Sequence, residues 1–305
     1  SWGKNEEAKP LYKRSLAIDE KIYGSYHPEI ATDLNNWARL LKTLPYTNAL
    51  LLSQGKYAEA EPLYERSQTI QEKALGPEHH AVAVVLNNRA GLLQSQGKYT
   101  EAEPLYERSQ AIREKALGPE HPAVAVVLNN RAGLLKSQGK YEEVEPLYKR
   151  SLDIVEKTYG PDHPKIAIVL NNWAGLLKSQ GKYEEAKPLY KRSLDIDEKT
   201  YGPDHPEIAI VLNNWAELLK SQGKYAEADP LYLRAIEIEE KALGTEHPGL
   251  ATTLNNRALL LDKQEKYAEA IPLLERALSI RMKLGGNHPD TVSTQNSLEI
   301  VRKKV

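Results

Sequence analysis

HPKIAIVLNNWAGLLKSQGKYEEAKPLYKRSLDIDEKTYGPD, residues 163–204, contains two helical patterns separated by a Gln-Gly-Lys turn. Pro164 suits the first turn of a helix, because its φ is fixed and its missing N–H would have no partner there. The spacing predicts a first helix, helix A, over about 166–179, with Gly181 just beyond its end. Apolar residues at helical spacing predict a second helix, helix B, over about 184–201. No strand pattern appears, so the predicted fold class is all α.

The same pattern recurs along the chain with a period of 42 residues. Residues 121–162 are identical to 163–204 at 35 of 42 positions. A pair of Asn residues marks the same point of helix A in successive units, as Asn87-Asn88, Asn129-Asn130, Asn171-Asn172, Asn213-Asn214 and Asn255-Asn256. Such self-similarity is typical of repeat proteins, so one module copied many times is expected rather than several unrelated domains.

The period divides the chain, which we treat as a single array over 1–305, into eight parts. These are an orphan helix B at 1–24, a longer repeat at 27–78, five repeats at 79–120, 121–162, 163–204, 205–246 and 247–287, and a capping helix at 288–305. The array is thus expected to hold six complete helix pairs. Because the chain opens on Ser rather than Met, we expect it to be a fragment of a longer protein.

The longer repeat carries a ten-residue insertion at 43–52. Pro45 disfavours a helix through this segment. We therefore expect helix A to stop near Thr43 and a short helical piece to restart after Thr47. The extra Leu residues need cover from a neighbour or from a second molecule, so any self-association of this otherwise monomeric chain is expected to use the insertion.

Composition excludes several classes of function. Lys and Arg number 41 against 42 Asp and Glu, which leaves no basic field to attract nucleic acid or an anionic membrane. No apolar stretch approaches the length of a membrane-spanning helix. The absence of Cys removes disulfides, thiolate catalysis and Cys-ligated zinc. We expect an intracellular, cytoplasmic protein with no nucleic-acid or membrane partner.

Helix A carries two apolar stripes, which predict how it packs. In the unit at 163–204 one stripe consists of Ala167, Leu170, Ala174 and Leu177, and the other of Val169, Trp173 and Leu176. A helix with two apolar stripes lies between two neighbours, while its third face, which holds the Asn pair, stays open. An inner helix layer packed on both flanks predicts an α-solenoid.

The repeat resembles the tetratricopeptide (TPR) family. Small and aromatic residues of its pattern appear as Ala132, Gly139, Tyr141, Tyr148 and Ser151. The 42-residue length and the Leu-Asn-Asn and Gly-Pro-Asp-His-Pro motifs resemble the long TPR variant of kinesin light chains over the whole chain. The resemblance implies a right-handed superhelix of antiparallel helix pairs that binds proteins.

The residue after each Asn pair departs from the kinesin-light-chain pattern, which usually has Leu there. The Trp/Arg slot, as we name this position, holds Trp37, Arg89, Arg131, Trp173, Trp215 and Arg257. This alternation is more similar to TPR arrays of algal gene families, some of them joined to NB-ARC nucleotide-binding switches. Two interpretations of the slot stay open: a long side chain that fills space against another helix, and a contact to a ligand.

Catalytic, cofactor and metal sites are not predicted. The recurring Gly-Lys-Tyr is a helix–helix turn rather than a phosphate-binding loop. One His per repeat, such as His163, is expected to start a helix rather than to bind a metal ion. Acidic pairs such as Glu184-Glu185 open a solvated helix, where they suit the helix dipole. We therefore expect a non-enzymatic chain that needs no cofactor.

The open face of helix A is the predicted peptide-binding groove. Two consecutive Asn in mid-helix have no rationale in helix stability, and their amides suit the backbone of an extended peptide. The alternative is that each Asn bonds to the neighbouring repeat and aligns the stack. Besides the five Asn pairs, the predicted groove consists of Val126, Ile168, Ile210, Arg39, Lys136, Lys178, Lys220 and Glu217. Glu217 and Asp262 are expected to make its C-terminal end acidic.

The last helix is predicted to be a cap. The stripe that reads Ala, Leu, Ala, Leu in earlier repeats reads Val292, Gln295, Glu299 and Arg302 there. The other stripe keeps Leu298 and Val301. We expect the polar stripe to face solvent, as terminal repeats require.

Overall fold

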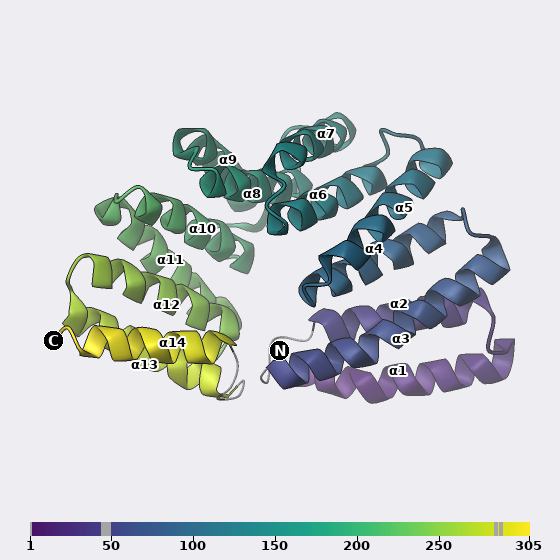
Figure 1. Ribbon diagram of the computed structural model, residues 1–305, viewed down its shortest axis with the longest axis horizontal. Coiled ribbons are helices and arrows are strands. Elements are labelled where there is room, and N and C mark those ends of the chain that lie inside the picture. The colour runs from purple at the N-terminus through teal and green to yellow at the C-terminus, as the bar shows by residue number, and fades with distance from the viewer. Residues whose placement is uncertain (1, 44–49, 284–285, 287–288) are drawn as a thin grey trace. The chain divides into compact units, whose positions relative to one another are not determined.

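The computed structural model describes residues 2–43, 50–283, 286 and 289–305. The chain divides into two compact units. Unit 1 comprises Ser1–Pro45 and Leu52–Thr158, and unit 2 comprises Tyr46–Leu51 and Tyr159–Val305. The described residues form fourteen helices (Figure 1), so the all-α fold class is confirmed.

Seven helices lie wholly or mostly within unit 1. They are α1 (Trp2–Tyr23), α2 (Pro28–Thr43), α3 (Leu50–Leu75), α4 (His80–Ser95), α5 (Tyr99–Leu117), α6 (Pro122–Ser137) and α7 (Tyr141–Tyr159). Helix A of one repeat contacts helix A of the next, as α4 does with α2 and α6, while α5 lies against both α4 and α6.

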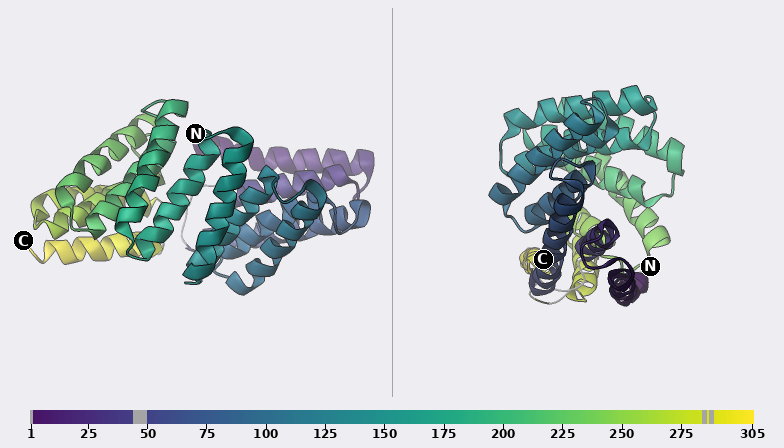
Figure 2. Two further views of the ribbon diagram at one scale, coloured as in Figure 1. Left: turned by 90° about the horizontal axis from the view of Figure 1, so that it is seen from above. Right: turned by 90° about the vertical axis from the view of Figure 1, so that its right-hand side faces the viewer.

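Unit 2 repeats this arrangement. Its helices are α8 (Pro164–Ser179), α9 (Tyr183–Tyr201), α10 (Pro206–Ser221), α11 (Tyr225–Leu243), α12 (Pro248–Lys263), α13 (Tyr267–Met282) and α14 (Pro289–Arg302). The members of each pair run antiparallel, and Figure 2 shows the helices from two further directions. The bounds of α8 and α9 agree with the helices predicted for residues 163–204 to within two residues.

Two devices define the ends of helix A. Before the helix, the Nδ1 of a His accepts a hydrogen bond from the backbone N–H two residues on, as His121 does from Ala123 at 3.1 Å. After it, Gly139 turns the chain at φ 75°, in the left-handed region that favours glycine. These His residues are therefore helix N-caps, in agreement with the sequence, and no group of three or more metal-ligating side chains occurs among the described residues.

The turn in the repeat 247–287 breaks this rule, because Glu265 takes the left-handed conformation at φ 61° where the preceding repeat has Gly223 at φ 74°. A residue with a Cβ loses about 1–2 kcal/mol in this conformation. We expect Glu265→Gly to raise the free energy of unfolding by about 1 kcal/mol in urea denaturation. Lys266→Gly is the control, since Lys266 has φ −87° and gains nothing from glycine there.

Helix B packs on helix A through two recurring residues. A Tyr at its centre is almost completely buried in five repeats, as Tyr64, Tyr106, Tyr148, Tyr190 and Tyr232. Three residues later in four of them, a buried Ser donates its hydroxyl to a carbonyl of the paired helix A, as Ser109 does to Ala83 at 2.7 Å. These contacts hold the outer helix against the inner one.

At the insertion, α2 ends at Thr43, as expected. Residues 44–49 lie outside the described part of the chain. From Leu50 onward the expectation of a short helical piece is wrong, because α3 continues through Gly55 to Leu75 as one helix. An interior Gly costs a helix about 1 kcal/mol. The hydrogen bonds gained when a formed helix extends through the segment offset this cost. Self-association through 43–52 stays a prediction.

The helix α14, which the sequence predicts as a cap, buries one of its two stripes and exposes the other. Leu298 and Val301 are buried in one apolar cluster with Ala258, Leu261 and Leu274 of the preceding repeat. The predicted polar stripe is exposed along its whole length, at Val292, Gln295, Glu299 and Arg302. The helix therefore covers the last apolar face of unit 2 and presents a polar one to solvent.

Candidate functional site: the open face of helix A

In unit 1 the open face of helix A combines apolar side chains with the Asn pairs. Val84 of α4 and Val126 of α6 are 40% and 42% exposed, although their neighbours on both flanks are buried. Asn130 donates its side-chain N–H to the Oδ1 of Asn87 at 3.0 Å, and Asn88 donates in the same way to Asn35 at 3.0 Å. The second Asn of one repeat thus bonds to the first Asn of the repeat before it.

Unit 2 has the same features. Ile168 of α8 and Ile210 of α10 are 54% and 49% exposed. The Asn ladder, as we name these inter-repeat bonds, continues in this unit with Asn214 to Asn171 and Asn256 to Asn213, each at 3.1 Å. In the cap, Thr294 donates its hydroxyl to Asn255 at 3.3 Å and ends the ladder.

The ladder supports the interpretation that the Asn pairs align the repeats. It uses only some of the hydrogen-bond donors and acceptors of these side chains. Each rung uses one N–H of the second Asn and the carbonyl oxygen of the first. An amide side chain offers two N–H donors and an oxygen with two lone pairs. Most Asn of the pairs are half-buried rather than buried, so the face retains donors and acceptors for a peptide backbone.

The charged border of the predicted groove is more neutral than the sequence suggested. Arg39 is exposed at one end. In unit 2, Glu217 forms an ion pair with Lys220 and accepts a hydrogen bond from the hydroxyl of Tyr232. Asp262 pairs with Lys304 at 2.6 Å. The expectation of an acidic C-terminal end is therefore wrong, because both carboxylates are neutralised by neighbouring lysines.

Lys178 differs from the other lysines of this border. Its side chain is half-buried on α8. Burial lowers the pKa of its ammonium, an effect that the charge of Glu217 opposes and that of Lys220 reinforces. Lys136 occupies the same position in unit 1 and is also half-buried. An anionic group on a ligand would stabilise the charged ammonium of Lys178 and so offset part of the hydration that burial removes.

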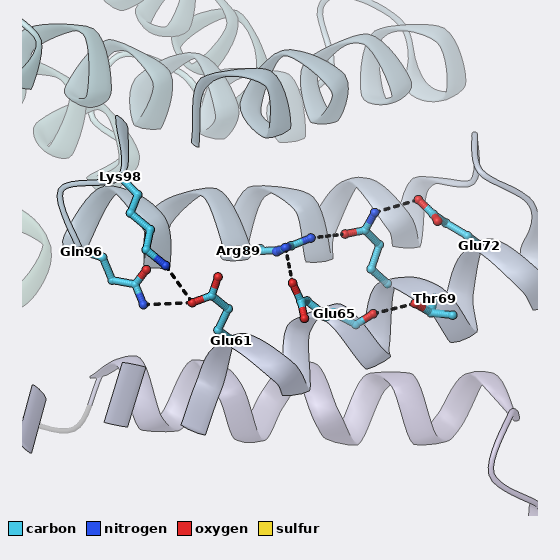
Figure 3. Close-up of polar contacts among 8 residues, drawn as sticks. Glu61, Glu65, Thr69, Glu72, Arg89, Gln96 and Lys98 are labelled. Atoms are coloured by element: carbon cyan, nitrogen blue, oxygen red, sulfur yellow. Dashed lines mark hydrogen bonds and ion pairs between the residues drawn. The ribbon is translucent and has the colours of Figure 1, made fainter. Parts of the chain in front are cut away.

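The Trp/Arg slot faces the preceding helix B rather than the open face. In Figure 3, Arg89 of α4 reaches Glu65 of α3 at 2.5 Å, and it also contacts Gln68 at 3.2 Å. Arg131 contacts Glu107 at 2.6 Å and Gln110 at 3.3 Å in the same way. These contacts favour the space-filling interpretation of the slot in the Arg repeats.

The Trp repeats use a different helix B. Trp215 packs in one apolar cluster with Leu194 and Tyr190 of α9, where Lys191 and Leu194 replace the Glu and Gln that face Arg89 and Arg131. Glu-x-x-Gln therefore precedes Arg89 and Arg131, and Lys-x-x-Leu precedes Trp37, Trp173 and Trp215. Arg257 is an exception, because Leu233 and Ile236 stand at these positions and it pairs with Asp229 at 2.8 Å instead. The sequence contained this signal, which comparison of successive repeats could have found.

The match between the Trp/Arg slot and the two facing residues of the preceding helix B predicts that mutations at these places have coupled effects on stability. Arg131→Trp should lower the free energy of unfolding by about 1 kcal/mol, because Glu107 and Gln110 lose their partner and meet an apolar ring. Adding Glu107→Lys and Gln110→Leu should restore most of it. Urea denaturation of the single, double and triple variants measures the coupling energy, and additive effects would contradict the match.

Sequence reasoning missed one feature of unit 2, a hollow of about 410 Å³ at the C-terminal ends of α10 and α12. Its lining residues are Lys220, Ser221, Tyr225, Leu259, Asp262, Lys263, Ser297, Ile300 and Val301. Ser297 and Ile300 of α14 occupy the positions of Asn256 and Leu259 one repeat earlier. The cap thus continues the open face and gives it an apolar depression.

Comparisons with known proteins place the chain in a family. The model of the tetratricopeptide repeat matches residues 49–90, 81–157, 124–199, 165–228 and 207–283. A search of curated protein sequences finds no relative. Among the described residues, no helix has the length and apolar character needed to cross a membrane.

Several solved structures are similar to the chain. The structure of a putative kinesin light chain of Podosopora anserina with nearly identical TPR-like repeats is 26% identical, with a TM-score of 0.56, over 68% of this chain and 99% of that one. BtubC (BKLC) of P. vanneervenii is 23% identical, with a TM-score of 0.61, over 77% and 93%. A TPR protein of Parabacteroides merdae is 19% identical, with a TM-score of 0.62, over 99% and 98%.

These neighbours include proteins of the kinesin-light-chain type and give no support to a link with NB-ARC proteins, which stays a prediction. TPR domains generally bind proteins or peptides and are typically non-catalytic. With family matches that together span most of its length, and consecutive antiparallel helix pairs in both units, the chain belongs to the tetratricopeptide repeat family.

Proposed function

We propose that the chain is a non-catalytic scaffold that binds an extended peptide or a partner helix on the open face of helix A. Four exposed apolar residues on the open face support this proposal, namely Val84, Val126, Ile168 and Ile210. The flanks of the same helices are buried, so these side chains are free to contact a partner. They would supply apolar anchor points, and the Asn amides beside them would bond to the ligand backbone.

The observation that carries the proposal is the presence of glycine at position 133. Gly133 lies inside α6, where Gly costs about 1 kcal/mol relative to Ala. An added Cβ would meet only the side-chain Nε2 of Gln94, at an ordinary 3.7 Å. Since the fold leaves room for Ala, the missing side chain is best explained by the close approach of a ligand backbone.

Selection of peptides by display on the immobilised chain tests the proposal. The affinity of a selected peptide should fall at least tenfold when Ile168 and Ile210 are replaced by Asp, because each new carboxylate would lie against an apolar group of the peptide. Both residues are exposed, so the variant should stay folded. Leu233→Asp is the matched control, since Leu233 is similarly exposed but lies on helix B. Equal binding by both variants would contradict the proposal.

A kinesin-light-chain-like cargo adaptor is a second candidate function. It is favoured by the 26% identity to the putative kinesin light chain, which extends over 99% of that structure. Both candidate functions use the open face for binding. They differ in the kind of full-length protein to which the repeat array belongs. Heptad repeats upstream in the full-length gene would favour the adaptor.

A further inference from the structure

In unit 2, the open face of helix A already holds one carboxylate of the chain itself. Glu217 of α10 accepts hydrogen bonds from the Nζ of Lys220 on the same helix and from the hydroxyl of Tyr232 on α11. It lies one turn beyond Asn214, which donates a rung of the Asn ladder. The two helices of this repeat thus contribute one donor each to a carboxylate site, which we name the Lys-Tyr site.

The preceding repeat has the same two donors. Lys178 of α8 and Tyr190 of α9 stand at the positions of the two donors to Glu217, whereas Gly175 stands at the position of Glu217 itself. Helix B packs on helix A in the same way in both repeats, and Tyr190 is as completely buried as Tyr232. The α8–α9 pair therefore has a second Lys-Tyr site, in which a glycine replaces the residue that carries the carboxylate.

The hydroxyl of Tyr190 lacks the acceptor that the hydroxyl of Tyr232 has. Tyr190 is only 1% exposed, and in the described parts of the chain its hydroxyl forms no hydrogen bond. Burial and the charge of Glu217 raise the pKa of Tyr190, so the hydroxyl keeps its proton and can donate it. A buried donor of this kind gains free energy when an acceptor binds beside it.

Unit 1 shows that the hydroxyl of this conserved position in the repeat reaches the right place. There Tyr106, the equivalent of Tyr190, donates its hydroxyl to the side-chain oxygen of Gln94 at 3.1 Å. Gln94 occupies in α4 the position that Lys178 occupies in α8. The hydroxyl therefore lies beside the Lys178 position of helix A, within reach of a group that also contacts the lysine.

We propose that Lys178 and Tyr190 bind one Asp or Glu side chain of the peptide ligand above Gly175, in the way that Lys220 and Tyr232 bind Glu217. This inference rests on the proposed function, because it names the chemistry of the ligand on the same open face. The missing side chain at Gly175 leaves the space for the acid. Both bonds to the carboxylate would be charge-assisted and therefore strong.

Glu217 then sets the register of the ligand. It already occupies the Lys-Tyr site of its own repeat, and its charge would repel a second acid placed there. Lys178 and Lys220 together outweigh the single charge of Glu217, so the site at α8 keeps a net positive charge. The two successive repeats therefore accept an acidic side chain at α8 and exclude one at α10.

Peptides selected by display on the wild-type chain test the inference. They are synthesised with an amidated C-terminus, so that any carboxylate belongs to a side chain. Replacement of their shared Asp or Glu by the amide should lower affinity at least tenfold, and Lys178→Met should remove this difference. Lys191→Met is the matched control, since Lys191 is exposed on helix B. Selection on Glu217→Gly should yield peptides with a second acid.

A measurement without peptide tests the Lys-Tyr site by itself. Gly175→Glu gives this repeat a carboxylate of its own, as the next repeat has. The pKa of the introduced carboxyl, measured by NMR, should lie at least one unit below the ordinary Glu value of about 4.3. Lys178→Met or Tyr190→Phe in the same chain should raise it again, because each removes one donor.

The two measurements separate failure of this inference from failure of the proposed function. Peptides that need Ile168 and Ile210 but depend neither on an acid nor on Lys178 would overturn the inference and leave the proposed function intact. If no peptide binds the open face, the proposed function fails, and the pKa decides the site. A lowered pKa that depends on both donors then supports a carboxylate site, and an ordinary pKa overturns it.

Discussion

Replacing Asn130, Asn214 and Asn256 together by Ala is expected to lower the free energy of unfolding by about 3 kcal/mol. Each of the three donates one rung of the Asn ladder, at 3.0, 3.1 and 3.1 Å. Each loss removes a bond worth about 1 kcal/mol and strands the oxygen of its partner, which for the buried Asn87 adds a desolvation cost. Urea denaturation measures the effect.

Asn36→Ala is the matched control for this triple variant. Asn36 is the second Asn of the first complete repeat, and the described residues contain no ladder bond from it. Its loss should therefore cost little. If the open face also binds peptide, the triple variant should lose at least tenfold in affinity per folded molecule. Lower stability with unchanged affinity would assign the ladder a structural role alone.

The period and the helix signals were sufficient to predict the fold. Helix A and helix B of residues 163–204 follow from the Pro at position 164, the Gly181 turn and apolar residues at helical spacing. The polar stripe of α14 likewise predicted its exposure. These features depend on local conformation and on which face is apolar, and both can be inferred from one repeat.

The candidate site was less predictable, because its contacts join neighbouring repeats. The sequence placed the Asn pairs on the open face, but the partner of Asn130 depends on the offset between adjacent helices. The pairing of Glu217 with Lys220 and Tyr232 likewise depends on side-chain directions. The continuity of α3 through Gly55 was missed because helix propagation outweighed a turn signal that ends helix A in later repeats.

Two buried acids of unit 2 were also not predicted. Glu239 of α11 is only 6% exposed, and its Oε2 has no hydrogen-bond partner among the described residues. Burial raises the pKa of Glu239 to about 7, an effect that a hydrogen bond with Thr253 partly opposes. At the same position of the preceding repeat, burial and the charge of Glu207 raise the pKa of Asp197 to about 6. Both acids stand at a position of helix B that faces the neighbouring helix in other repeats. The apolar pattern of the helix therefore gives no sign of a buried carboxylate, and only the identity of the residue does.

Glu239→Gln is expected to raise the free energy of unfolding by about 3 kcal/mol at pH 8 and to change it little at pH 4. The pKa of Glu239 rises from 4.5 to about 7 on folding, and one unit corresponds to about 1.4 kcal/mol. Between these values the folded chain keeps a proton that the unfolded chain releases, so native stability falls as the pH rises through this window. Gln has no charge to bury, so the variant avoids this loss.

Urea denaturation of both proteins from pH 4 to pH 8 measures the difference. Burial lowers the pKa of the nearby His247, whose Nδ1 accepts the Gly249 N–H at 3.1 Å. Protonation of this cap lowers stability as the pH falls through its folded pKa, but it acts on both proteins and cancels in the comparison. Glu237→Gln removes an exposed carboxylate from the same helix and controls for net charge. A gain for Glu239→Gln that is the same at pH 4 and pH 8 would mean that better packing of the amide, rather than the buried charge, stabilises the junction between α11 and α12.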